Sequence, residues 1–246
     1  MMASLRHTPN THARNSKATP WSTRTVGGIV AELPAAGNLF RQERIDFCCG
    51  GHRSLSEVLA DQGRPAEALD GALDILRDAA GRTPSDAAPA TLADPDLADY
   101  IDRTHHAYMH EALPYVGKLS ETVLKAHGGR HPELFRLHVL YGQLRGELEQ
   151  HLIKEETLLF PLYGDPDADP DMKGRIVAEL RAEHEAAGVL LHRMNDLTAD
   201  YLVPEDACPT WRRLYEALHE MEGDLFRHIH LENNVLFERS ASGECA

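Results

Sequence analysis

The sequence predicts an all-α protein, an up-down four-helix bundle preceded by a small helical module. Four long segments space their apolar residues alternately by three and four positions, which is the period of a helix that buries one face. Proline and glycine breakers bound each of these segments. No segment shows the sustained alternation of apolar and polar residues that is typical of a strand.

Length, charge and cysteine content narrow the classes of function. The 246 residues suit two modest domains, and the net charge of −14 argues against a nucleic-acid partner, because phosphate binding needs concentrated Lys and Arg. No run approaches the roughly 20 apolar residues of a membrane span, and the first residues lack the apolar core of a secretory signal. The four cysteines are too sparse for a disulfide framework. We therefore expect a cytoplasmic protein with no membrane and no nucleic-acid partner.

Composition divides the chain into four parts. Residues 1–24 are rich in Ser, Thr, Asn and Arg, which predicts a disordered tail. Short amphipathic stretches in 25–80 predict a small helical module, with two adjacent cysteines near its middle. The Ala-, Pro- and Thr-rich segment 81–94 is typical of a linker. The bundle is expected over 95–240.

The ends of the four bundle helices follow from their flanking residues. Asp94 is placed to cap the first helix, with Pro95 at its first helical position, and a pair of glycines at 128–129 ends it. Pro161 and the Gly164-Asp165-Pro166 loop are expected to stop the second helix, because an interior proline removes a hydrogen-bond donor. The second, third and fourth helices are predicted over 132–160, 171–201 and 210–239.

Histidine and glutamate interrupt the apolar stripe of every predicted helix. In the second helix the stripe passes through His151 and Glu155 and continues at Leu158 and Leu162. The fourth helix repeats the His-x-x-x-Glu pair, and the first and third helices each place a lone His on the stripe. Similar distances from the connecting turns put these groups at one height along the bundle. The six inward residues are His106, His151, Glu155, His184, His228 and Glu232.

These six residues predict a pair of bound metal ions. Two carboxylates and four imidazoles in a low-dielectric core are costly unless something neutralises them. Two bridging glutamates with two imidazoles for each ion form a donor set that suits iron or manganese, and leaves room for an oxo bridge or an exogenous ligand. Zinc is less natural, because the sequence has no His-Glu-x-x-His or Cys-x-x-Cys motif. Any single His could instead be a hydrogen-bonded core residue, and His110 and His127 are further candidate ligands.

Cys48 and Cys49 form a second candidate functional group. They precede Ser54 and Glu57, whose spacing is that of a capping box at the start of a helix. A helix N-terminus lowers the pKa of a nearby thiol, so we expect a reactive thiolate that binds metal or is oxidised. The alternative is that both are small buried apolar residues in a turn. Cys208 and Cys245 have no assigned role.

Four motifs carry a resemblance to a known family: Asp46-Phe47-Cys48-Cys49-Gly50-Gly51, His151-Leu152-Ile153-Lys154-Glu155-Glu156 with Leu159-Phe160-Pro161, Glu183-His184-Glu185-Ala186-Ala187-Gly188, and His228-Ile229-His230-Leu231-Glu232-Asn233-Asn234-Val235-Leu236-Phe237. With them the chain from residue 25 to 239 resembles the hemerythrin-like di-iron proteins that repair iron–sulfur clusters, of the RIC or ScdA type.

That resemblance implies a hemerythrin-like bundle with a non-haem di-iron centre, and the choice of iron over manganese rests mainly on it. The family ligands fall on the six inward residues, and the functional cysteines fall on Cys48 and Cys49. The resemblance also implies a cytoplasmic protein, often a homodimer, that restores iron–sulfur proteins damaged by nitric oxide or peroxide by donating iron.

Three functions remain open from the residues. An iron-donating repair protein would use the cysteine module together with the bundle. A carrier or sensor of nitric oxide or oxygen would need only the bundle. A di-iron reductase or oxidase acting on nitric oxide, peroxide or oxygen would need an electron donor and a repeatable redox cycle.

Overall fold

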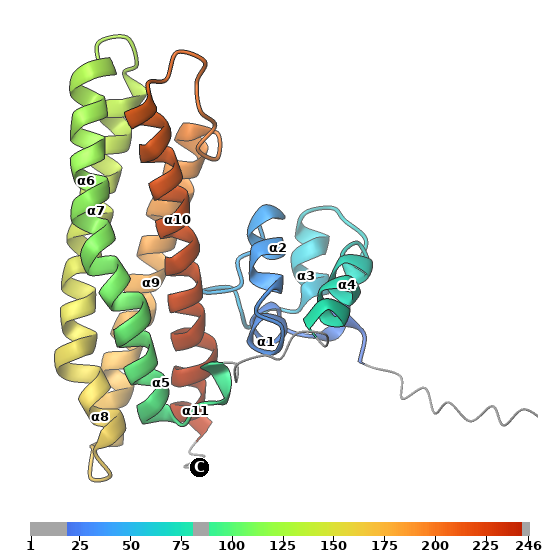
Figure 1. Cartoon of the computed structure of the whole chain (residues 1–246). Helices are drawn as coiled ribbons and strands as arrows, with labels where there is room; N and C mark the ends of the chain where they lie inside the picture. Colours follow the sequence, from blue (N-terminus) through green and yellow to red (C-terminus); the bar gives the residue numbers. More distant parts are fainter. Residues whose placement is uncertain (1–18, 81–88, 243–246) are drawn as a thin grey trace, which may run out of the picture.

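The structure is a computed structural model that describes residues 19–80 and 89–242. Long helices run side by side as a bundle, and a compact group of short helices lies against one side of it, next to α10 (Figure 1). The all-α bundle with a small helical region before it is as predicted. The helices of the bundle are α5 (Asp94–Ile101), α6 (Ala107–His127), α7 (Glu133–Lys154), α8 (Phe160–Gly164), α9 (Pro170–Thr198), α10 (Pro209–Leu231) and α11 (Phe237–Ser242).

The predicted apolar stripes form the core of the bundle. Leu144 of α7, Met194 of α9 and Leu218 of α10 are buried in one cluster together with Met109 and Leu113 of α6. Burying side chains of this size removes apolar surface from water at roughly 25 cal/mol per Å², which is the main stabilising contribution to such a bundle. The core therefore holds the four long helices in a fixed register.

Three segments of π-helix interrupt the helices in the described part of the chain, and the sequence pattern did not predict them. They are η3 (Asp102–His106), between α5 and α6, η4 (Glu155–Leu159), between α7 and α8, and η5 (Glu232–Leu236), between α10 and α11. A π-turn accommodates one extra residue and rotates the residues that follow it. Each of these turns begins or ends at a predicted metal ligand.

The rotation at η4 overturns one part of the predicted stripe. Leu158 and Leu162 were expected inside, but Leu158 is 47% exposed and Leu162 is only partly buried. Leu159, 0% exposed, and Tyr163 take their place in the core. The extra residue in the π-turn shifts the buried face by one position, and this is the physical reason for the difference.

Two predicted helix ends are also wrong. Pro161 does not stop the second helix, because the helical path continues through η4 into α8; it ends at Gly164, where the predicted Gly164-Asp165-Pro166 loop begins. Asp94 does not cap the first helix, because Ala93 occupies the N-cap position and Asp94 lies in the first turn, where it pairs with Arg239.

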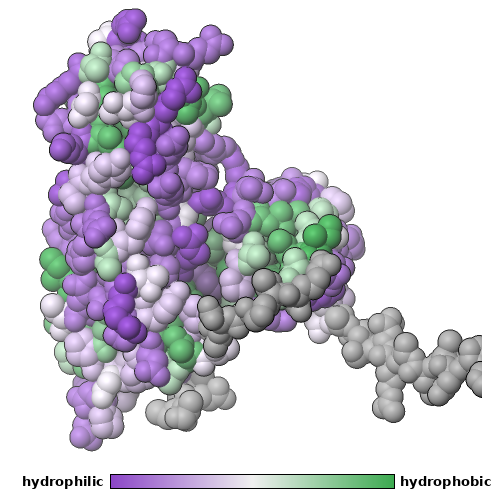
Figure 2. Space-filling view, in the orientation of Figure 1, coloured by the Kyte–Doolittle hydropathy of each residue, from purple (hydrophilic) through white to green (hydrophobic). Residues whose placement is uncertain are grey.

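The N-terminal region folds around a small core of its own. Its elements are η1 (Trp21–Thr23), α1 (Val26–Glu32), α2 (Ala36–Gln42), α3 (Leu55–Asp61) and α4 (Asp70–Ala80). Phe40, Leu55 and Leu73 are buried together at its centre. The predicted capping box is present at α3, where Ser54 and Glu57 each accept a hydrogen bond from the other's backbone N–H. On the visible face hydrophobic residues gather over this region, whereas the bundle shows mainly hydrophilic residues (Figure 2).

The predicted tail and linker are partly ordered. Trp21 is buried and its indole N–H donates to Asp74 at 2.8 Å, so the predicted disorder is wrong for the end of segment 1–24. Residues 1–18 lie outside the described residues. In the linker, residues 81–88 also lie outside them, but η2 (Pro89–Thr91) is a 3-10 turn. Arg239 donates to the carbonyl of Leu92 at 2.7 Å, which holds this second half of the linker against the bundle.

Asn234 of η5 is the main contact between the two regions. Its side-chain amide donates to the carbonyls of Phe47 at 3.2 Å and Cys48 at 2.9 Å. Two glycines make room for it, since a Cβ added at Gly27 or Gly51 would lie 2.5 or 2.1 Å from its Oδ1. The cysteine loop, which joins α2 to α3 and contains Cys48 and Cys49, is therefore closely fitted around one side chain of the bundle.

Further contacts extend this interface along α10. The Phe47 ring lies between Phe40 and Phe226, with centroid distances of 6.4 and 6.1 Å. Arg41 donates to the carbonyl of His219 at 3.2 Å, and Arg44 forms an ion pair with Asp200. Apolar packing and polar contacts together fix the orientation of the N-terminal region. Among the described residues, no helix combines the length and apolarity needed to cross a membrane.

Gly51→Ala should loosen this interface, because its new Cβ has no space beside Asn234. We expect a loss of about 1–3 kcal/mol in the free energy of unfolding, the usual cost of overpacking a closely fitted site. Gly142→Ala is the control, because Gly142 is exposed on α7 with nothing within 4 Å of an added Cβ. The control should gain up to about 1 kcal/mol from helix propensity. Urea unfolding of both variants tests this, and an unchanged midpoint for Gly51→Ala would contradict the tight fit.

Candidate metal centre

Six buried side chains from four helices meet at one level of the bundle. They form two overlapping groups of four, each of which could hold a metal ion, and both groups contain Glu155 and Glu232. The first group adds His106 and His228, and the second adds His151 and His184. Each of the six is at most 4% exposed. The structure thus brings together all six residues that the stripes indicated.

The imidazoles are arranged in two facing pairs. The Nε2 atoms of His106 and His228 are 3.1 Å apart, and those of His151 and His184 are 3.0 Å apart. Two nitrogens bound to one ion at about 2.1 Å and at roughly a right angle would be about 3 Å apart. Each pair therefore has the separation that a single ion requires.

The two carboxylates extend between the pairs. Oε2 of Glu155 lies 3.3 Å from Nε2 of His106 and 3.2 Å from Nε2 of His151, so it faces both groups. Glu232 faces them with different oxygens: Oε1 lies 2.9 Å from Nε2 of His228, and Oε2 lies 3.2 Å from Nε2 of His184. Both glutamates are placed to bridge two ions.

Unpaired oxygens show that this cluster is incomplete without a cation. Within the described residues, both oxygens of Glu155 and Oε2 of Glu232 are buried and accept no hydrogen bond. Leaving buried carboxylate oxygens unpaired is strongly unfavourable. Divalent ions between the four imidazoles would neutralise both carboxylates, so the donor set fits a di-metal centre.

Polar contacts behind three of the imidazoles aim their Nε2 atoms at the cluster. Nδ1 of His106 lies 3.0 Å from Oε1 of Glu156, and Nδ1 of His151 lies 2.8 Å from Oε2 of Glu183. Nδ1 of His184 lies 3.0 Å from Oδ1 of Asn233. An acceptor at Nδ1 fixes the tautomer that leaves Nε2 free to bind a metal. Such contacts are characteristic of metal-binding histidines.

Burial and the two carboxylates compete in setting the proton affinities of the cluster. Burial opposes protonation of His151, but Glu155, Glu232 and Glu183 outweigh it and raise its pKa to about 9. For His106 the same opposition between burial and Glu155 ends in a raised pKa. Burial lowers the pKa of His228, despite the proximity of Glu232. Burial and Glu232 both oppose ionisation of Glu155, yet the surrounding histidines hold its pKa below its ordinary value.

The remaining candidate histidines do not join the two groups. His110 contacts Glu156 at 2.8 Å and so lies behind His106. His127 packs on Trp211, with a centroid distance of 5.1 Å, in the part of the bundle near the end of α6. His105 is also outside the two groups: it is buried, lies 3.0 Å from Asp224 and stacks on His228 with a centroid distance of 5.7 Å.

Cys48 and Cys49 lie in the loop that Asn234 holds against η5. Their Sγ atoms are 3.8 Å apart, and Cys48 is buried whereas Cys49 is partly exposed. The expected lowering of the thiol pKa is wrong for Cys48. A hydrogen bond with Cys49, burial and the nearby Asp46 carboxylate raise its pKa well above the ordinary value. The N-terminus of α3 cannot offset this, because Ser54 and Glu57 already cap it five residues beyond the thiols.

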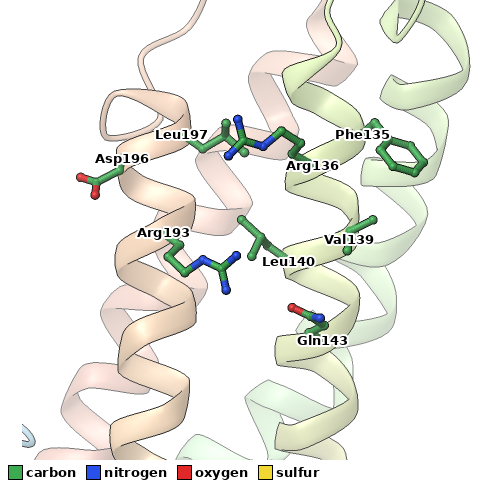
Figure 3. A pocket seen from close by; sticks show the side chains of 8 residues that line it. All are labelled: Phe135, Arg136, Val139, Leu140, Gln143, Arg193, Asp196 and Leu197. Carbon is green, nitrogen blue, oxygen red and sulfur yellow. The ribbon is translucent and has the colours of Figure 1, made fainter.

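Two hollows lie outside the cluster. One, between α7 and α9, is lined by residues that include Arg136, Leu140 and Arg193 (Figure 3). It contains none of the six predicted ligands. The other is a cavity of about 730 Å³ between the cysteine loop and helices α9 and α10, and it is lined by Cys48, Cys49 and Glu222. Only the second hollow connects with a predicted functional group.

Comparisons with known proteins agree with both regions. Residues 97–240 match the family model described as the hemerythrin HHE cation binding domain, and residues 22–75 match a domain of unknown function, DUF542.

Three relatives show the extent of the similarity. The iron-sulfur cluster repair protein ScdA of Staphylococcus haemolyticus is 33% identical over 216 residues, which cover 87% of this chain and 96% of that protein. The iron-sulfur cluster repair protein YtfE of Yersinia pseudotuberculosis is 33% identical over 228 residues, covering 91% and 99%. YtfE of Pectobacterium carotovorum is 36% identical over 230 residues, covering 90% and 98%.

Replacing either bridging carboxylate should empty the centre. Wild-type protein is expected to carry about two metal ions per chain, and Glu155→Ala and Glu232→Ala well under one, because each residue belongs to both groups. Glu147→Ala, exposed on the same helix as His151, is the control and should keep the wild-type content. Elemental analysis of the purified proteins measures this. Full metal content in both glutamate variants would rule out the shared-carboxylate arrangement.

The contact behind His151 should tune metal affinity. Glu183→Gln is expected to lower it by about 10–100-fold, because His151 loses the carboxylate that orients it. Glu179→Gln is a matched control one turn away, since Glu179 shares the Lys154 partner but makes no contact with His151. Competition with a chelator measures the metal affinity. If both substitutions lowered it equally, the loss would come from the lost ion pair with Lys154 and not from the contact with His151.

Proposed function

Because this chain belongs to the ScdA and YtfE family of iron–sulfur cluster repair proteins, with a hemerythrin HHE domain, we propose that it binds two iron ions and donates iron to damaged clusters. The observation that carries this is the pair of imidazole groups that share both Glu155 and Glu232. Imidazole and carboxylate ligands suit iron and manganese, and the relatives' names point to iron.

The six residues would hold the ions as follows. His106 and His228 would bind one ion, His151 and His184 would bind the other, and both glutamates would bridge them. An oxo bridge would complete the pair. When bound, the iron pair would supply exchangeable iron and redox chemistry. The protein's contribution is to orient four imidazoles, exclude water and place two carboxylates between the ions.

One bound ion has a less constrained ligand than the other. His151 and His184 each have a polar partner at Nδ1, whereas the buried Nδ1 of His228 has no hydrogen-bond partner among the described residues. An imidazole without such a partner is held less firmly in its metal-binding orientation. This difference supports release of iron from the His106–His228 side.

The η5 turn gives the thiols a connection to the centre. Three consecutive residues have three tasks there: Glu232 bridges, Asn233 orients His184, and Asn234 holds the carbonyls of the cysteine loop. A displacement of the loop would therefore act directly on two groups of the centre. This supports a repair function in which Cys48 and Cys49 guide transfer to a damaged iron–sulfur protein. The homodimer implied by the resemblance remains a prediction.

A second candidate function is reversible binding or reduction of nitric oxide. The full burial of all six residues favours it, because a closed core with two imidazoles per ion leaves positions for a small gas only. Such a function would use the bundle without the thiols, and reduction would also require an electron donor.

A repair assay separates these functions. A purified iron–sulfur enzyme inactivated by nitric oxide is incubated with iron-loaded protein, and recovered activity is followed together with iron lost from the donor. We expect recovery in proportion to iron lost, no recovery above the spontaneous rate with Glu155→Ala, and wild-type recovery with Glu147→Ala. Cys48→Ser/Cys49→Ser should slow recovery while retaining iron. Repeated consumption of nitric oxide with a reductant, without iron loss, would favour a reductase and overturn the donor function.

A further inference from the structure

A second set of metal-ligand atoms lies outside the bundle core. One carboxylate oxygen of Asp46 and the two thiols of Cys48 and Cys49 lie within 4.8 Å of one another. The thiols are free, and neither belongs to the histidine cluster. The loop that carries them is anchored to η5 by Asn234.

The separation of the two sulfur atoms matches a single shared ion. Two thiolates bound tetrahedrally to one ion at about 2.3 Å would be about 3.8 Å apart. The Sγ atoms of Cys48 and Cys49 are 3.8 Å apart. Side chains of adjacent residues commonly diverge, so this convergence is a specific feature of the loop.

Asp46 supplies a third donor in a fixed position. Its Oδ1 lies 3.2 Å from Sγ of Cys48 and accepts the backbone N–H groups of Cys48 and Cys49, each at 3.0 Å. Its Oδ2 accepts the N–H of Gly50 at 3.0 Å. These hydrogen bonds hold the carboxylate beside the thiols, and Oδ2, which accepts a single N–H, keeps a lone pair for an ion. A mixed sulfur and oxygen set selects borderline cations over magnesium or calcium.

The fourth coordination position faces a space large enough for another molecule. Asp46, Cys48 and Cys49 all line the cavity of about 730 Å³ between the loop and the bundle, and Cys49 is partly exposed. Three protein ligands and one open position are typical of a site where a ligand exchanges, whereas a structural site is closed.

We propose that Asp46, Cys48 and Cys49 form a mononuclear site for a borderline divalent cation, and that it holds ferrous iron in transit to the client. The transit role rests on the proposed repair function, but binding of the cation does not. Uptake replaces two thiol protons, which pass to solvent, with one dication, and delivery reverses this by ligand exchange. No electron is transferred in either step.

Cadmium binding tests the site directly, because cadmium–thiolate bonds absorb in the ultraviolet whereas its bonds to imidazole and carboxylate do not. Full-length protein carrying Cys208→Ser and Cys245→Ser, with its bundle metal in place, is titrated with Cd²⁺. We expect a thiolate band that saturates at about one Cd²⁺ per chain. Cys48→Ser and Cys49→Ser should each strongly reduce the band, and Asp46→Asn should keep it with lower affinity. Ferrous iron present anaerobically in large excess should lower the apparent affinity for cadmium, because both ions compete for the same thiolates.

The outcomes separate this site from the repair function. A thiolate band at one equivalent, together with no cluster repair by iron-loaded wild-type protein, would retain the thiol site and reject iron donation from the bundle. No band at one equivalent, in protein with an unchanged circular dichroism spectrum, would overturn the site even if repair is normal. A band that persists in the double variant Cys48→Ser/Cys49→Ser would likewise overturn the site. Because Cys49 is partly exposed, its substitution provides a test that does not disturb the core.

Discussion

Two carboxylates buried among four imidazoles are the constraint on which this structure depends. A bundle of this length could be closed with apolar side chains at every level, as it is around Leu144 and Leu218. At one level it instead contains Glu155 and Glu232, both 0% exposed, with oxygens that no hydrogen bond satisfies within the described residues. Such a layer is stable only when cations occupy it. The helices must therefore present ligands with an accuracy that apolar packing does not demand.

The π-turns explain how ordinary helices reach that accuracy. A regular α-helix has 3.6 residues per turn, so side chains spaced by three or four residues drift slowly around the helix. Over many turns, a metal ligand and the apolar stripe therefore cannot both keep facing the bundle core. The extra residue in each of η3, η4 and η5 rotates the residues around it about the helix axis. This rotation occurs where His106, Glu155 and Glu232 must face the bundle core. The helix with His184 has no such turn and contributes one ligand.

The helical periodicity of the sequence was sufficient to predict the fold and the six polar residues of the core. This is because the spacing of apolar residues along a helix determines which of its side chains are buried. The periodicity failed just beyond Glu155, where Leu159 replaces Leu158 inside, because a π-turn changes the period. A step of five separates Ile101 from His106, both fully buried, across η3. The role of Asn234 and the raised pKa of Cys48 were not predictable, since both arise from contacts between segments almost 190 residues apart or from burial in the assembled fold.

Asn233 and Asn234 also change where one domain should be said to end and the other to begin. Along the chain the boundary falls in the linker before α5. In space, however, Asn233 contacts the metal ligand His184, whereas the next residue, Asn234, contacts the cysteine loop. An exchange of N-terminal regions between two relatives at the linker would therefore separate the loop from the residue around which it is shaped. Recombination within this fold would keep the contact only if η5 travelled together with the N-terminal region, so the two regions behave as one unit in such an exchange.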